Sequence, residues 1–145
     1  MVDDAFATET LRGGRALVVD DEPGIRRLVC RALGTQDMEV DEARDGDEGL
    51  RRAGTMAYDV ILLDLHLPEL DGMVVLHRLL SREPGQAVVV FSCQSDPATR
   101  RRCLRAGARA FLAKPFSLVD LCESISAACA HGIGDADTRP ARLIR

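Results

Sequence analysis

The sequence predicts an α/β domain built on a doubly wound, five-stranded parallel sheet, and three observations lead to this fold class. Short runs of apolar and β-branched residues alternate with stretches of helical period. A candidate helix follows each candidate strand, and right-handed crossovers of this kind cover both faces of a parallel sheet. The chain has 145 residues, of which 46% are hydrophobic, enough for one conventional core. We therefore expect one domain over residues 15–130, between tails over residues 1–14 and 131–145.

Five segments have the composition of strands in a parallel sheet, which are short runs rich in apolar and β-branched residues. In chain order they are RALVVD at 15–20, MEVDEA at 38–43, YDVILLD at 58–64, QAVVVFS at 86–92 and ARAFLA at 108–113. The third run is apolar up to its last residue, so we expect it to be buried on both faces.

Helical signals fill the segments after these strands. Residues 25–33 carry apolar side chains at i, i+3, i+4, i+7 and i+8, and residues 118–129 follow a similar pattern, so each segment has one apolar face. Asp71 and Asp96 stand where N-caps are expected, and Pro97 occupies a first helical position. Three shorter helices are therefore predicted over residues 46–53, 71–82 and 96–106.

Composition and charge argue against several classes of protein. The net charge of -4 gives no support to a nucleic-acid binder, so we expect no direct nucleic-acid binding by this domain. No apolar run approaches the roughly 18 residues of a membrane span, and the N-terminus lacks the basic and apolar regions of a secretory signal. The five cysteines are scattered without a CxxC pair, which indicates reduced thiols and no zinc site. These features favour a cytoplasmic protein with no membrane contact.

Polar side chains stand at the carboxyl ends of four predicted strands. The first strand ends in Asp20 and Asp21, the third in Asp64 and the fourth in Ser92, while Lys114 follows the fifth. This edge of an open parallel sheet holds the functional crevice. Three carboxylates gathered there would repel one another without a cation, and oxygen ligands select a hard ion such as Mg²⁺. An ammonium and a hydroxyl opposite them suit a phosphoryl group, for which Asp64 would be the nucleophile.

Lys114 is the only lysine among 19 basic residues, the other 18 being arginines. A composition bias explains the arginines but does not explain this exception. A single lysine placed at random among the basic positions would fall here about one time in nineteen. Because a guanidinium is larger than an ammonium and has a different geometry, we expect a specific role for Lys114.

The break in the chain after Asp64 also points to a site. Apolar residues lead up to this carboxylate in the stretch DVILLDLHLPELDG, and Pro68 and Gly72 follow at once. We expect these two residues to turn the chain so that the crevice above the strand stays open.

Together these segments resemble the receiver domain of two-component response regulators. The similarity covers roughly residues 14–130 and rests on VVDDE after the first strand, LLDLHLPELDG around the third, VVFS at the fourth and FLAKPF at the fifth. It implies a flavodoxin-like sheet of strand order 2-1-3-4-5. It also implies a signalling switch, phosphorylated by a sensor histidine kinase or a phosphotransfer protein, that is catalytic only on itself.

The resemblance assigns roles around the phosphorylated aspartate. Asp64 is the phosphoacceptor. Asp21 ligates Mg²⁺ directly and Asp20 through water, and Asp64 and the backbone carbonyl of His66 complete the protein's share of the ligands. The side chains of His66 and Gln94 are expected to set the lifetime of the phosphorylated state.

Other roles implied by the resemblance concern the switch. Ser92 and Lys114 hold the phosphoryl oxygens, and Phe111 turns inward when Ser92 moves toward the phosphate. Pro115 follows a peptide bond that is cis in the family. Taken alone, Phe111 would be assigned to the core and Ser92 to a turn. Cys93 is interpreted as a small hydrophobic residue rather than a redox sensor.

The acidic pair after the first strand has a structural alternative. Asp20 or Asp21 could cap the helix that follows. Two adjacent acids at the end of an apolar strand favour a metal site over a cap, although one residue could serve both purposes.

The fourth helix and its exit are strongly basic, with arginines at positions 100, 101, 102, 105 and 109. Two interpretations stay open, a solvated face and a partner surface. The resemblance implies that the fourth helix, the fifth strand and the fifth helix form the face that changes on phosphorylation and often forms a homodimer. The transcription factors that pair through it typically carry two acidic residues just before the aromatic, where this chain has Arg109 and Ala110.

Two other functions compete with the switch. A phosphatase of the aspartyl-phosphate class would show a DxDxT motif, but His66 stands two residues after Asp64, and Glu22 two after Asp20. A degenerate receiver would act as a protein-binding module without phosphorylation, against which all five core positions hold competent residues. Nucleotide binding has no support because neither GxGxxG nor GxxxxGK[ST] occurs.

The sequence leaves the output and the kinase open. The chain could be a stand-alone regulator, a phosphorelay carrier or a fragment that ends before its effector. We expect the kinase to contact the first helix around residues 24–28 and Phe116.

Overall fold

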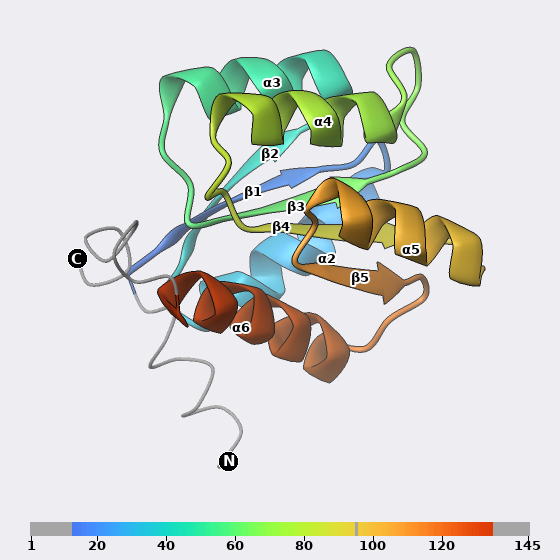
Figure 1. Ribbon diagram of the computed structural model, residues 1–145. Helices are drawn as coiled ribbons and strands as arrows, with labels where there is room; N and C mark the ends of the chain where they lie inside the picture. The colour runs from blue at the N-terminus through green and yellow to red at the C-terminus, as the bar shows by residue number, and fades with distance from the viewer. Residues whose placement is uncertain (1–12, 95, 135–145) are drawn as a thin grey trace.

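The computed structural model describes residues 13–94 and 96–134 of the chain (Figure 1). In this part of the chain five strands alternate with five helices, as predicted. The strands are β1 (Arg15–Val19), β2 (Glu39–Ala43), β3 (Val60–Asp64), β4 (Val88–Ser92) and β5 (Ala110–Ala113). The helices are α2 (Pro23–Gly34), α3 (Gly46–Thr55), α4 (Gly72–Arg82), α5 (Pro97–Ala106) and α6 (Leu118–Gly134).

All strand pairs are parallel, and the order in the sheet is β2-β1-β3-β4-β5. The predicted doubly wound fold and its strand order are therefore confirmed. The chain moves outward from β1 to β2 and then returns past β1 to β3. In sheets of this type the crevice opens where the winding direction reverses, here beside the carboxyl ends of β1 and β3.

Helices cover both faces of the sheet, with α2 and α6 on one side and α3, α4 and α5 on the other (Figure 1). Successive side chains of each strand point to opposite faces. In β3, Val60 and Leu62 pack under α2 and α6, whereas Ile61 and Leu63 pack under the other three helices. Every residue of β3 is buried, which confirms the expectation for this strand.

The predicted N-caps of two helices are confirmed. Asp71 accepts a hydrogen bond from Met73 N–H at the start of α4, and Asp96 accepts one from Thr99 N–H at the start of α5. The suggested cap at α2 is wrong, because the residue before this helix is Glu22 and its side chain makes no capping hydrogen bond.

Boundaries differ by a few residues from those expected. β3 begins at Val60 rather than at Tyr58, although Asp59 N–H still donates to the Arg15 carbonyl of β1 and the Tyr58 hydroxyl donates to Asp41 of β2. Helix α6 extends to Gly134, past the predicted end at residue 129. Of the predicted tails, residues 1–12 and 135–145 lie outside the described residues. Within the described part, no helix combines the length and the apolar character needed to cross a membrane.

Candidate functional site

Three carboxylates meet at the carboxyl ends of β1 and β3. Asp20 and Asp21 follow β1 directly and Asp64 is the last residue of β3, so the register of the two neighbouring strands brings them together. One carboxylate oxygen from each lies within 4.8 Å of the others. Asp20 and Asp64 are buried, whereas Asp21 is exposed. Such a set of oxygen ligands suits a hard divalent cation like Mg²⁺.

Burial disfavours the ionised form of the two buried carboxyls, Asp20 and Asp64. Burial raises the pKa of Asp20 above its ordinary value, although its Oδ1 accepts a hydrogen bond of 2.8 Å from Glu22 N–H. Burial also raises the pKa of Asp64, which accepts a hydrogen bond of 3.1 Å from His66 N–H, and the nearby charge of Asp20 raises this pKa further. A cation bound between them would relieve both effects, so the residues present fit a metal ion.

Lys114 supplies a positive charge opposite this acidic cluster. Its Nζ lies 3.0 Å from Asp20 Oδ2 and 3.4 Å from both Asp64 Oδ2 and Glu22 Oε1. Burial alone would lower the pKa of Lys114, but the hydrogen bond to Asp20 and the charges of Asp64 and Glu22 outweigh it and raise the pKa. The side chain therefore carries an ammonium at neutral pH. The contact with Glu22 was not predicted from the sequence, although this residue is the third acid of the same run.

The ends of β4 and β5 bring Ser92 beside Lys114. Ser92 is buried, and its Oγ accepts a hydrogen bond of 2.9 Å from Gln94 N–H. Lys114 N–H donates to the Ser92 carbonyl, at 2.9 Å, and the peptide bond between Lys114 and Pro115 is cis. Phe111, in β5, lies in the buried cluster under α3, α4 and α5 with 8% of its surface exposed.

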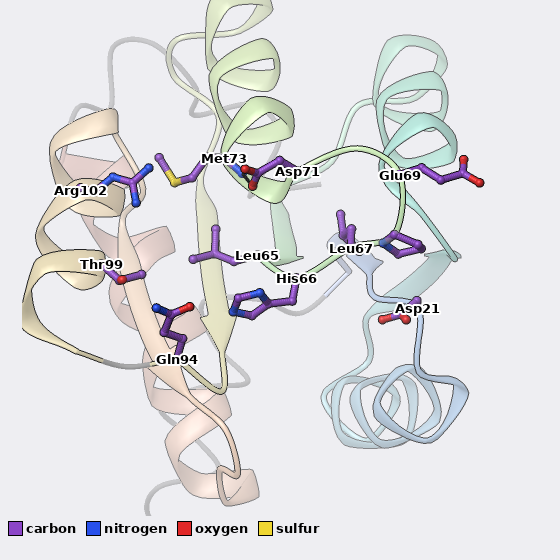
Figure 2. Close-up of a pocket in the computed structure, with 11 residues that line it drawn as sticks. Asp21, Leu65, His66, Leu67, Glu69, Asp71, Met73, Gln94, Thr99 and Arg102 are labelled. Atoms are coloured by element: carbon purple, nitrogen blue, oxygen red, sulfur yellow. Dashed lines mark hydrogen bonds between the residues drawn. The ribbon is translucent and has the colours of Figure 1, made fainter.

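A pocket of about 630 Å³ opens between the β3–α4 loop and the first turns of α5 (Figure 2). Asp21 lies at one side of it and Arg102 at the other, while His66 and Gln94 also line its wall. Pro68 belongs to the loop that forms the rim. Two of the predicted metal ligands, Asp21 and His66, therefore share one solvent-accessible opening with Gln94, the other residue expected to control the phosphate lifetime.

Gly72 lets the β3–α4 loop lie directly against the end of β3. Its N–H donates to the Leu65 carbonyl at 3.1 Å. A Cβ at this position would lie 2.5 Å from Leu65 Cα and 2.6 Å from the Asp64 carbonyl oxygen, which no side chain can tolerate. The sequence indicated a chain break here, and the structure adds that the break requires glycine.

The basic run separates into two parts. Arg109 is half-buried and donates to the carbonyls of Ala128, at 3.1 Å, and Gly85, at 3.0 Å, so it joins α6 to the loop before β4. The four arginines of α5, at positions 100, 101, 102 and 105, are exposed and form no ion pair within the described part of the chain. Arg109 lines the same surface pocket as Arg100 but differs from the four arginines of α5, because its guanidinium is hydrogen-bonded to backbone carbonyls.

Comparison with known proteins gives the same family along most of the chain. The family model of the response regulator receiver domain matches residues 16–126. The probable transcriptional regulatory protein TcrX of Mycobacterium tuberculosis is 35% identical over 105 residues, which is 72% of this chain and 45% of that protein. A protein-glutamate methylesterase/protein-glutamine glutaminase of Caldanaerobacter subterraneus is 40% identical over 110 residues, which is 74% of this chain and 30% of that protein.

Solved structures agree with this family. The crystal structure of a CheY-like receiver domain protein from Methanospirillum hungatei superimposes with a TM-score of 0.80 at 26% identity, over 86% of this chain and 98% of that one. The chain spans less than half the length of the two curated relatives. Since the family model covers more than half of the chain, the chain belongs to the response regulator receiver domains of two-component systems.

Proposed function

We propose that this receiver domain is a phosphorylation-controlled switch in which Asp64 accepts a phosphoryl group from a sensor histidine kinase or a phosphotransfer protein. The observation that carries the proposal is the buried contact of Lys114 with carboxylates from two strands, Asp20 at 3.0 Å and Asp64 at 3.4 Å. A lone ammonium facing an acidic cluster at this edge is the arrangement that phosphoryl transfer requires.

In this reaction a carboxylate oxygen of Asp64 attacks the phosphorus of the donor's phosphohistidine. The new O–P bond forms as the N–P bond breaks, and the bonding electrons remain on the histidine nitrogen. Lys114 leaves its carboxylate partners to pair with one phosphoryl oxygen, and the Ser92 hydroxyl donates to another. The result is an acyl phosphate on Asp64 and a free histidine on the donor.

Asp20, Asp21, Asp64 and the backbone carbonyl of His66 would hold Mg²⁺ in this site. The ion supplies positive charge that neutralises the phosphoryl oxygens during transfer. The raised pKa values of Asp20 and Asp64 support this assignment, because they reflect carboxylates that are poorly solvated by water alone.

The phosphoryl group shifts an equilibrium between two conformations that both exist beforehand. We assign the movement to Ser92 and to Phe111, which lies on the neighbouring strand two register positions before Ala113, the partner of Ser92. His66 and Gln94 control how long the phosphoryl group persists. Their place beside Asp21 in the wall of the 630 Å³ pocket supports this role, because side chains next to the acidic cluster can limit the approach of water.

The switch acts on partners rather than on an external substrate. The domain catalyses only its own phosphorylation and dephosphorylation, and the esterase activity in the name of one relative belongs to that protein. We assign residues 15–130 to the receiver domain, residues 1–14 to a tail and residues 131–145, the first four of which continue α6, to a tail or the start of a linker. The scattered cysteines, which include no CxxC pair, support a cytoplasmic location.

We further propose that the face formed by α5, β5 and α6 binds a second copy of the chain. A pocket of about 390 Å³ runs along this face, with Arg100 and Leu104 on one side and Asp120 and Glu123 on the other. A twofold axis through such a surface sets the basic side of one copy against the acidic side of its partner. The surface is therefore self-complementary, although Arg109 and Ala110 depart from the acidic pattern of the transcription-factor subclass.

The test of the switch is phosphorylation by acetyl phosphate, measured by intact mass. The wild type should gain one phosphoryl group in the presence of Mg²⁺ and none in EDTA, and Asp64→Asn should gain none under either condition. Asp47→Asn, an exposed aspartate of α3, is the matched control and should behave like the wild type. A folded wild type that gains no phosphoryl group in excess Mg²⁺ would instead support a phosphorylation-independent binding module.

A further inference from the structure

Arg26 connects the acidic loop after β1 to strand β2. Its side chain projects from α2 and is only 11% exposed. One guanidinium nitrogen, Nη1, donates to the backbone carbonyl of Asp20 at 2.8 Å, and Nε donates to Glu42 Oε1 at 2.9 Å. The guanidinium therefore binds a main-chain atom of the acidic cluster, and among the described residues no hydrogen bond or ion pair joins it to the three carboxylates.

This contact determines the orientation of one peptide plane. The Asp20 N–H donates to the Ala43 carbonyl at 3.1 Å, and the Asp20 carboxylate is held by Glu22 N–H and Lys114. The peptide bond between Asp20 and Asp21 contains the Asp20 carbonyl oxygen. This oxygen accepts the hydrogen bond from the Arg26 side chain.

Asp21 depends on that peptide plane more than the other two acids do. Its carboxylate is exposed, and in the described part of the chain no hydrogen bond or ion pair reaches it. Asp20 and Asp64, in contrast, are fixed by backbone N–H groups and by Lys114. The position of Asp21 relative to the other two acids is therefore set by its backbone alone.

We propose that Arg26 is a positioning residue for the metal site, which acts through the Asp20 carbonyl to keep Asp21 within ligand distance of Asp20 and Asp64. The inference rests on the proposed function, because it takes Mg²⁺ to be the ion bound there. Glu42 completes the arrangement, since it pairs with the guanidinium and balances a positive charge that would otherwise repel a divalent cation.

Lysine cannot replace arginine in this role. A guanidinium presents several N–H donors in a fixed plane and can reach the carbonyl and the carboxylate together, whereas an ammonium is a compact point charge on a flexible chain. The variant Arg26→Lys therefore keeps the charge and most of the packing but loses the defined geometry. Arg26→Gln removes the charge as well.

The experiment measures Mg²⁺ affinity by isothermal titration calorimetry on the full, unphosphorylated chain. Both Arg26→Lys and Arg26→Gln should weaken binding by about tenfold, the low end of the loss seen when a residue that orients a metal ligand is removed. Arg27→Gln is the matched control, because Arg27 is the exposed neighbour on the same helix. It should bind Mg²⁺ as the wild type does. Urea unfolding of each variant in EDTA reports stability separately.

Three other results would contradict the proposed role of Arg26 or the metal site on which it depends. Lower stability with unchanged Mg²⁺ affinity in both variants would make Arg26 a structural residue only and overturn the proposal. Tighter binding by Arg26→Gln would show that its charge, and not its geometry, acts on the ion. No Mg²⁺ binding by the wild type would overturn the metal site itself, and thereby the proposed function as well as this inference.

Discussion

At the scale of single residues, the site consists of charged side chains whose burial disfavours their ionised forms. Lys114 is in contact with three carboxylates, and two of these, Asp20 and Asp64, have raised pKa values. The aspartates and Lys114 could be predicted from the sequence because they stand at strand ends, which a parallel sheet brings together. The parts played by Glu22 and Arg26 could not be predicted, because these contacts depend on how α2 packs beside the loop.

Mg²⁺ should stabilise the fold through the acidic cluster. An ion present at about 100 times its Kd adds about 2.7 kcal/mol to the free energy of unfolding. The variant Asp21→Asn should lose this gain but be at least as stable as the wild type in EDTA, because the exposed Asp21 side chain makes no hydrogen bond or ion pair in the described residues and its charge no longer repels the other two carboxylates. Urea unfolding with and without Mg²⁺ measures both values. An Asp21→Asn protein that is still stabilised by Mg²⁺ to the same extent would remove Asp21 from the ligand set.

At the scale of helices and strands, periodicity and turn residues were sufficient to locate the elements but not their contacts. The alternation of apolar runs predicted five strands and five helices, and the caps Asp71 and Asp96 fixed the starts of α4 and α5. Gly72 appeared in the sequence only as a chain breaker. Its close approach to Leu65 is a tertiary contact, which no local pattern contains.

Replacing Gly72 with alanine should therefore cost stability. The new Cβ would lie 2.5 Å from Leu65 Cα and 2.6 Å from the Asp64 carbonyl oxygen, and both are backbone atoms that cannot rotate away. We expect a loss of about 2–4 kcal/mol in the free energy of unfolding, as for other overpacked buried sites. Gly24→Ala is the matched control, because a Cβ there meets nothing within 4 Å, and alanine in a helix should add about 0.5 kcal/mol. Equal effects of the two substitutions in urea unfolding would contradict this account.

The start of α3 should give the stability a dependence on pH. Asp45 accepts a hydrogen bond from Glu48 N–H, and Glu48 in turn accepts one from Arg44 N–H at 2.8 Å. This hydrogen bond and the charge of Arg52 lower the pKa of Glu48 below its ordinary value. A carboxyl whose pKa is lowered by folding stabilises the native state above its unfolded pKa and loses this contribution as the pH falls through the folded value.

Glu48→Gln should therefore be less stable than the wild type at pH 7, by about 0.5 kcal/mol, and the difference should vanish in acid. Urea unfolding at pH 7 and at successively lower pH measures it. A difference between Glu48→Gln and the wild type that stays constant with pH would mean that the ionised form of Glu48 contributes nothing.

At the scale of the whole molecule, the strand order determines which helices lie next to each other on the surface. Alternating strands and helices are compatible with more than one order, and the order 2-1-3-4-5 came from the family resemblance. Because β5 is the edge strand, helices from opposite faces, α5 and α6, flank it. Only this arrangement places the arginines of α5 beside Asp120 and Glu123 of α6 along one pocket.

The charges on this face should control self-association. Sedimentation of the phosphorylated chain should detect a dimer, and Arg100→Glu or Glu123→Arg alone should raise its dissociation constant by at least about tenfold, which corresponds to 1.4 kcal/mol. In the double variant each reversed charge again faces its opposite across the twofold axis, so the double variant should regain most of the affinity lost by the single variants. Arg51→Glu, which reverses an exposed charge of α3 away from this face, is the control and should leave the dissociation constant unchanged. A chain that stays monomeric when phosphorylated, or a double variant no better than the single ones, would show that this face does not bind a second copy.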